Sequence, residues 1–192
     1  NFNAIHNLSF NGDFTNNGTV RFTNQTSPVV NAYYTAAITT TGAANVTFTG
    51  TSNNTLSCNG ITDFYVFKLN KGIDQTYTLT VNSTNTANFA LYGPNNGASP
   101  TKAFYLIAGT IKLNANINIP SLTEGGIDFG IPETCALWIN GATVSTTIVG
   151  LNGTGYQALS VFGQIRVSDG SMSSGDAAGL VCANNSREAQ QA

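Results

Sequence analysis

The sequence contains very little charge. Only 8% of its 192 residues are Asp, Glu, Lys or Arg, whereas ordinary soluble domains contain roughly a quarter. The seven basic residues are scattered singly, so there is no basic patch and we expect no nucleic-acid partner. No apolar run approaches the roughly 20 residues that a membrane-spanning helix needs, so we expect no membrane insertion.

Residue types used in catalysis and metal binding are also scarce. His6 is the only histidine, which argues against histidine-based triads and most metal sites. Cys58, Cys135 and Cys182 lie far apart without CxxC spacing, and we interpret them as buried free thiols, with their oxidation state left open. No nucleotide-binding, hydrolase or metalloprotease motif occurs. The sequence therefore predicts no catalytic residues, no metal site and no cofactor.

Apolar residues are abundant and alternate with polar ones. They make up 41% of the chain, with eleven Phe and seven Tyr, which is enough for a packed core. Such alternation is typical of a β-strand, where successive side chains point to opposite faces. The longest run predicts one strand over 111–119, ended by Pro120, with an apolar face made of Ile111, Leu113, Ala115, Ile117 and Ile119. Shorter runs surround Val20, Val46, Phe67, Leu79, Leu159 and Ile165.

Turn clusters rich in Gly and Asn separate these runs, and only the stretch 186–192 tolerates a helix, so the chain is predicted to be all-β. Three features favour a solenoid over the alternative, an antiparallel β-sandwich. Segment 18–22 is similar to 109–113, and 46–49 to 77–80. The abundant Asn and Thr suit side-chain ladders between stacked coils. Low charge suits strand edges that the next coil covers.

Several segments carry a resemblance to a known family. They are Val46–Ser83, Gly109–Leu113, Ile117–Pro120, Ile131–Glu133, Ala136–Gly141, Leu159–Val167, Ser171–Asp176 and Gly179–Val181. Together they resemble very large β-helix surface proteins of Bacteroidota. The resemblance implies a pectin-lyase-like, right-handed parallel β-helix that is secreted to the bacterial cell surface as type IX secretion cargo.

We therefore expect residues 1–192 to form a single β-helix segment of a larger protein. Residues 1–44 could form an irregular or capping portion, and 184–192 a tail. The expected partners are neighbouring domains of the same polypeptide. Secretion or surface-assembly proteins and glycans are further candidates.

Carboxylates and aromatic residues are the candidates for a site. Polysaccharide-cleaving β-helices use carboxylates from neighbouring coils, and the candidates here are Asp63, Asp74, Glu124, Asp128 and Glu133. Glu124, Asp128 and Glu133 cluster around glycines and, with Tyr156, are the tentative glycan contacts. The other tyrosines considered as exposed stacking platforms are Tyr33, Tyr34 and Tyr92. Trp138 lies in an apolar run, which favours a place in the core.

The leading functional hypothesis is a non-catalytic structural or adhesive segment of a secreted cell-surface protein. A carbohydrate-binding or polysaccharide-degrading β-helix domain is the alternative. An ice-binding solenoid is a second alternative, because outward threonines occur in TxT units at Thr47/Thr49 and Thr78/Thr80.

Overall fold

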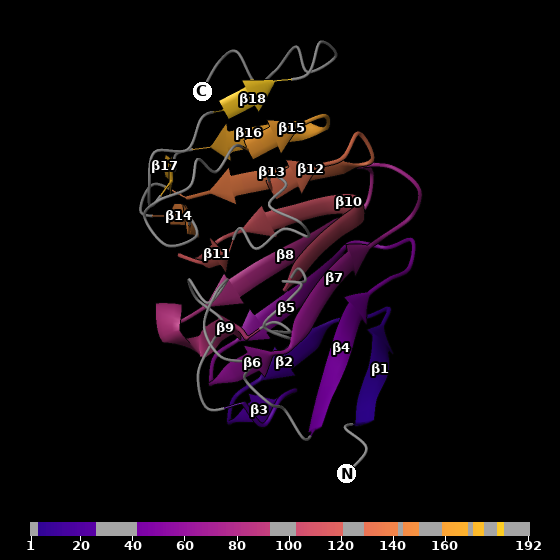
Figure 1. The fold of residues 1–192 in the computed structure, drawn as a ribbon, viewed down its shortest axis with the longest axis vertical. Helices are drawn as coiled ribbons and strands as arrows, with labels where there is room; N and C mark the ends of the chain where they lie inside the picture. Colours follow the sequence, from indigo (N-terminus) through magenta and orange to yellow (C-terminus); the bar gives the residue numbers. More distant parts are fainter. Residues whose placement is uncertain are drawn as a thin grey trace, which may run out of the picture.

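The computed structural model describes residues 4–25, 42–92, 103–120, 129–141, 144–149, 159–168, 171–174 and 180–182. In these residues the chain forms short strands and one 3-10 helix, η1 (Thr86–Asn88) (Figure 1). The strands are β1 (Ala4–Phe10), β2 (Phe14–Asn16), β3 (Val20–Arg21), β4 (Gly42–Phe48), β5 (Asn54–Cys58), β6 (Thr62–Phe64), β7 (Val66–Asn70), β8 (Thr78–Ser83), β9 (Phe89–Leu91), β10 (Phe104–Leu113), β11 (Asn118–Pro120), β12 (Phe129–Ile131), β13 (Cys135–Asn140), β14 (Ser145–Val149), β15 (Leu159–Val161), β16 (Gln164–Ser168), β17 (Ser171–Ser174) and β18 (Leu180–Cys182).

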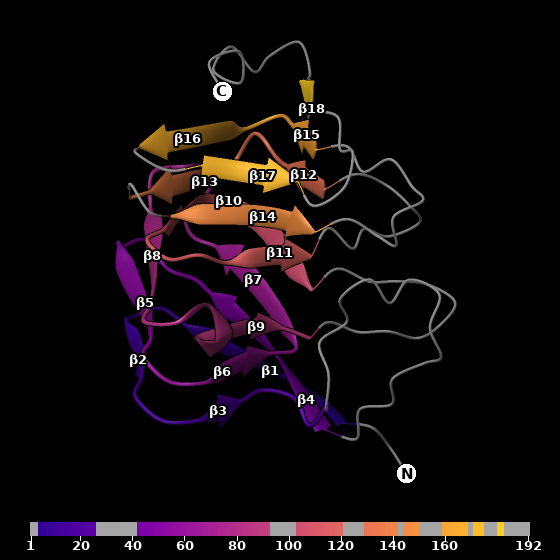
Figure 2. The same ribbon diagram turned by 90° about the vertical axis from the view of Figure 1, so that its left-hand side faces the viewer.

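The strands stack coil upon coil. Every pairing between two of these strands is parallel. In Figure 2 the strands β11, β14 and β17 face the viewer and run from left to right, while the chain climbs from the N-terminus at the bottom to the C-terminus at the top. That is the right-handed sense. The predicted right-handed parallel β-helix is confirmed, and an antiparallel sandwich is not the fold.

Five parallel sheets form the walls of the solenoid. Sheet A contains β1, β4, β7 and the first half of β10, and sheet B contains β2, β5, β8, the second half of β10, β13 and β16. Sheet C contains β3, β6 and β9, sheet D contains β11, β14 and β17, and sheet E contains β12, β15 and β18. The lower coils therefore run through sheets A, B and C, and the upper coils through B, D and E.

Strand β10 joins the two halves because it belongs to two sheets. Its residues 104–108 pair with β7 in sheet A, and residues 110–113 pair with β8 in sheet B. At the corner between them Gly109 has a φ of 104°, a conformation that residues with a Cβ rarely adopt. A Cβ there would also meet the Cβ of Lys71 at 3.0 Å. Glycine at this position lets one strand turn from one wall of the solenoid into the next.

The core runs through the centre of all the coils and changes in composition along the axis. In the lower coils it is a stack of phenylalanine rings, with Phe67 at the centre of the best-buried ones. In the upper coils it is aliphatic and includes Ile111, Leu113, Ile117, Ile131, Leu137, Ile139, Val161 and Ile165. Burying each such side chain contributes roughly 1.5–3 kcal/mol, so this shared interior is what holds the coils together.

Two of the cysteines belong to this core. Cys58 and Cys135 are buried free thiols, which confirms the prediction for both. Burial raises the pKa of each thiol to about 11, so both remain protonated at neutral pH. The side chain of Cys182 lies outside the described residues.

The predicted strand over 111–119 is wrong in one respect. Ile111, Leu113, Ala115 and Ile117 are all buried, as the alternation required. However, β10 ends at Leu113, and β11 starts at Asn118 in a different sheet. The chain turns a corner of the solenoid between them while still placing every second side chain inside. Alternation therefore indicated the buried face but not the bend.

The self-similar segments lie in different sheets of the solenoid. Segment 18–22 contributes β3 to sheet C, whereas 109–113 lies on β10 in sheet B. Segment 46–49 includes the end of β4 in sheet A, whereas 77–80 leads into β8 in sheet B. The similarity thus reflects a shared strand pattern rather than equivalent positions on successive coils. Within the portion 1–44, considered for an irregular or capping structure, residues 4–21 contain β1, β2 and β3.

A glycine at a close contact between coils provides a first test of the fold. Gly163 lies between β15 and β16, and an added Cβ would come within 2.2 Å of both the Cys135 and the Pro132 carbonyl oxygens. Because both obstacles are backbone atoms, we expect Gly163→Ala to lower the free energy of unfolding by about 1–3 kcal/mol. Urea denaturation measures the loss. Gly12→Ala is the matched control, since a Cβ there has no neighbour within 4 Å, and equal losses for both variants would contradict the packing of these coils.

Candidate functional site

The outer face of sheet B carries the most distinctive arrangement of polar and aromatic side chains. The strand register aligns one residue from each of five successive coils into a column, which we call the cation–aromatic column: Thr55, Thr80, Lys112, Trp138 and Arg166. Two residues further along each strand, a second column contains Asn82, Asn114 and Asn140, which we call the amide ladder. The residues between the two columns, such as Val81, Leu113 and Ile139, point into the core. Both columns therefore lie on the outside.

Trp138 is at the centre of the cation–aromatic column. The Lys112 ammonium lies over its ring, 4.0 Å from the centroid, and its indole N–H donates to the Ser168 hydroxyl at 3.0 Å. The ring is partly exposed rather than buried. The prediction of a core position is therefore wrong. In strand β13 the inward positions are taken by Leu137 and Ile139, so alternation places the tryptophan outside.

Arg166 follows on the next coil. Its guanidinium donates through Nε to the Gln164 side-chain oxygen at 2.8 Å and through Nη2 to the same atom. A guanidinium has five N–H donors, so three are not used in these two bonds. Within the described part of the chain no carboxylate forms a salt bridge with Arg166 or with Lys112. The column therefore contains one basic residue on each of the two coils that flank Trp138, namely Lys112 and Arg166.

The amide ladder connects three successive coils. Asn114 donates to the side-chain oxygen of Asn82 at 2.9 Å, and Asn140 donates to that of Asn114 at 2.8 Å. This is the ladder that the abundance of asparagine predicted. Other asparagine pairs join coils in the same way, namely Asn45 with Asn7 and Asn59 with Asn17. Each bond uses one amide hydrogen of the donor and leaves its second N–H available.

A polar cleft adjoins the ladder at the corner where the chain leaves sheet B. Its volume is about 430 Å³, and the residues lining it include Ser83, Asn85, Thr86, Asn114 and Asn116. Asn114 belongs to both the ladder and the cleft. The cation–aromatic column, the ladder and the cleft therefore form one continuous surface.

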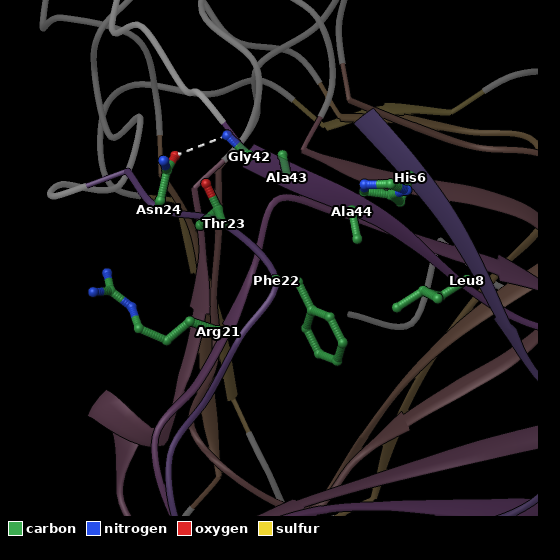
Figure 3. Close-up of a pocket in the computed structure, with 9 residues that line it drawn as sticks. All are labelled: His6, Leu8, Arg21, Phe22, Thr23, Asn24, Gly42, Ala43 and Ala44. Carbon is green, nitrogen blue, oxygen red and sulfur yellow. Dashed lines mark hydrogen bonds between the residues drawn. The ribbon is translucent and has the colours of Figure 1, made fainter. Parts of the chain in front are cut away.

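A second hollow lies in the first coil. Figure 3 shows it between His6 and Leu8 of β1 on one side and residues 21–24 on the other, with the ring of Phe22 projecting into the space. Its volume is about 730 Å³. The register pairs His6 with Ala44 and Leu8 with the buried Val46, so these side chains point to the inside of the solenoid. Leu8 is nevertheless 39% exposed. The groove is thus an open part of the core rather than a polar site.

A charge cluster in which Arg21 is exposed and Asp63 is buried lies beside this groove on sheet C. Arg21 Nε donates to the Asp63 carboxylate at 2.7 Å, and its Nη2 atom donates to the Gln25 carbonyl at 2.9 Å and the Tyr92 hydroxyl at 3.3 Å. Asp63 and Tyr92 are both buried. Tyr92 is therefore not an exposed stacking platform, contrary to prediction, because it packs beneath the guanidinium. The charged and hydroxyl groups of Arg21, Asp63 and Tyr92 pair with one another, so we interpret the cluster as structural.

The predicted acidic residues do not form a group where the structure describes them. Asp63 is paired on β6, and Asp74 lies in the turn before β8, where hydrogen bonds from Thr76 lower its pKa. Glu133 is exposed in the turn before β13, where its carbonyl accepts from Gln75 at 2.8 Å. Glu124, Asp128 and Tyr156 lie outside the described residues, as do Tyr33 and Tyr34. In the described ranges no three His, Cys, Asp or Glu residues lie together as metal ligands would, and no helix could cross a membrane.

The cation–aromatic column corresponds to a recurring pattern in the sequence. Each of its last four members is followed by one aliphatic residue and then a small polar one. The instances are Thr80-Val81-Asn82, Lys112-Leu113-Asn114, Trp138-Ile139-Asn140 and Arg166-Val167-Ser168. The recurrence marks equivalent positions on four successive coils of sheet B.

Comparison with known proteins adds no identification. No family model matches the chain, and no curated protein or solved structure matches it either.

Proposed function

We propose that this chain is a non-catalytic structural and adhesive segment of a large secreted β-helix protein of the bacterial cell surface. The observation that carries the proposal is the continuous stack of parallel coils whose outer positions are joined by asparagine ladders. Such a stack is a stiff body in which each coil contacts its neighbours, and it can space and present a binding face. The ladders achieve this with uncharged side chains, which accounts for the low charge.

Neighbouring coils or domains of the same polypeptide are the proposed main partners. In the described residues β1 pairs only with β4, and its inward-pointing Leu8 remains exposed beside the groove of Figure 3. A further parallel strand that paired with the open edge of β1 would cover this edge and the side chain of Leu8. Secretion through the type IX route, and contacts with surface-assembly proteins, belong to the same proposal and rest on the resemblance alone.

A polysaccharide-degrading domain is the alternative that the same surface allows. The test is to incubate the purified chain with polygalacturonate and other acidic glycans and to measure new reducing ends. We expect adhesion of chain-coated beads to an immobilised glycan without any cleavage. Cleavage that Asp128→Ala abolishes would overturn the non-catalytic role.

The ice-binding alternative has less support. It requires a flat array of threonines on one face, but Thr47 lies on β4 in sheet A, whereas Thr78 and Thr80 lie on β8 in sheet B. In sheet B the column that begins with Thr55 and Thr80 continues with Lys112.

The sequence flanking this segment in its gene tests the surface-protein assignment separately. A type IX sorting domain or further adhesive repeats would support it. A lyase domain on the same polypeptide would favour the degrading alternative.

A further inference from the structure

We propose that the outer face of sheet B binds an acidic polysaccharide, with a sugar ring packed against Trp138 and its anionic groups paired with Lys112 and Arg166. The inference rests on the proposed adhesive function and specifies its ligand. It places the site on the cation–aromatic column, the amide ladder and the adjoining cleft, away from the acidic loop residues that the sequence suggested.

The spacing of the two cations suits a repeating anionic ligand. Lys112, Trp138 and Arg166 occupy equivalent positions on three successive coils. Coils in such a stack are about 4.8 Å apart, so the Cα atoms of Lys112 and Arg166 are separated along the axis by roughly 10 Å. A chain of pyranose sugars advances by a similar distance per two units. An acidic sugar on each side of a central ring would therefore place one carboxylate or sulfate near each cation.

Trp138 is held in a fixed orientation for stacking. Its indole N–H is bound by Ser168, and Lys112 lies over the ring. The polar atom of the indole is therefore engaged inside the protein, and what remains for a ligand is the part of the aromatic surface that Lys112 does not cover. A sugar ring presents apolar C–H groups that pack well against such a surface. Because the ring is already ordered, binding loses little side-chain entropy.

The amide ladder supplies hydrogen bonds for the hydroxyl groups of a sugar chain. Asn114 and Asn140 each use one amide hydrogen within the ladder, and the second points to no partner in it. Asn114 is also exposed at the edge of the 430 Å³ polar cleft. An amide offers both a donor and an acceptor, which matches a hydroxyl better than it matches a phosphate.

Charge favours a polysaccharide over a nucleic acid. The protein has a net charge of -2, and the described residues of this surface offer two cations, Lys112 and Arg166. Affinity for nucleic acids grows with the number of phosphates that Lys and Arg neutralise, so two cations would give weak binding. An acidic glycan, which carries hydroxyl groups beside its anionic groups, fits two cations, one aromatic ring and a row of amides.

Calorimetric titration of the 192-residue chain tests the site. The probes are oligogalacturonate for carboxylates, dextran sulfate for sulfates, and neutral dextran. We expect at least one anionic probe to bind more tightly than dextran and to lose affinity as salt rises. Trp138→Ala should weaken it by about tenfold or more, and Lys112→Met and Arg166→Gln each by roughly three- to tenfold.

A matched pair of controls lies on sheet A. The Lys68 ammonium is 5.2 Å from the Tyr105 ring centroid on the outer face of that sheet. Lys68→Met and Tyr105→Ala therefore repeat the changes in charge and aromaticity away from the proposed site, and both should alter affinity by less than about twofold. Unchanged unfolding midpoints verify that the variants are folded, and Arg166→Gln serves as the test if Trp138→Ala does not fold.

Three results would overturn the inference. They are equal binding of neutral and anionic probes, equal weakening by the sheet A controls, or tighter binding of a single-stranded oligodeoxynucleotide with the same dependence on Trp138. All three results concern ligand binding at sheet B, so none of them would contradict the structural, non-catalytic role proposed above. Conversely, glycan cleavage would overturn the non-catalytic role while leaving binding at this surface in place.

Discussion

Phe67→Ala is expected to lower the free energy of unfolding by about 3–5 kcal/mol. The side chain is completely buried, and its ring centroid lies 5.3 Å from that of Phe48, 5.2 Å from Phe64 and 5.3 Å from Phe104. These three rings come from β4, β6 and β10, so the truncation leaves a cavity where three coils meet. The loss is large relative to the stability of an ordinary domain, which is about 5–15 kcal/mol.

Guanidinium denaturation monitored by circular dichroism measures this loss. Phe162→Ala is the matched control, because Phe162 is 48% exposed and its truncation should change stability by no more than about 0.5 kcal/mol. Phe67→Leu fills most of the cavity, so its loss of stability should lie between those of Phe67→Ala and Phe162→Ala. Similar losses for Phe67→Ala and Phe162→Ala would contradict a continuous interior through the lower coils.

The fold could be predicted because alternation in a strand is a local property. In β8 the inward Leu79 and Val81 are completely buried, whereas the outward Thr78 and Thr80 are only partly buried, as the pattern requires. The path of the chain around each coil, by contrast, is not fixed by the local sequence pattern. Val46 pairs with Phe67, whereas Ala4 pairs with Gly42, so successive coils use very different numbers of residues. The described coils therefore have no fixed repeat length for sequence comparison to find.

The site was harder to predict for the same reason. The proposed role of Trp138 depends on Lys112 and Arg166, which are its neighbours because the strand register aligns three coils. A single apolar run such as Ala136–Ile139 cannot show which of its residues face outward. The recurring pattern of an outward residue, an aliphatic residue and a small polar residue does carry that information, once the coils are known to be stacked.

Lys71 departs from the usual rule that charges stay at the surface. Its side chain is 1% exposed, and its ammonium donates to the Thr49 carbonyl at 2.8 Å and to the Asn54 side-chain oxygen at 2.7 Å. Both acceptors belong to the preceding coil, so the lysine ties two coils together at the corner between sheets A and B. Burial lowers the pKa of Lys71 below its ordinary value of 10.5, and attraction to Asp13 opposes this shift.

Lys71→Met is accordingly expected to lower the free energy of unfolding by about 2–4 kcal/mol at neutral pH, because two partly buried acceptors lose their donor. The pH dependence gives a sharper test. Between the lowered pKa of the folded protein and 10.5, the unfolded chain binds more protons, so the contribution of Lys71 to stability rises with pH. The neutral amine still has two N–H groups for its two acceptors. The stability difference between wild type and Lys71→Met should therefore widen as the pH rises towards 10.5. Urea denaturation of both proteins over this range cancels the other titrating groups, and a difference that narrows instead would show that the ammonium is not desolvated at this corner.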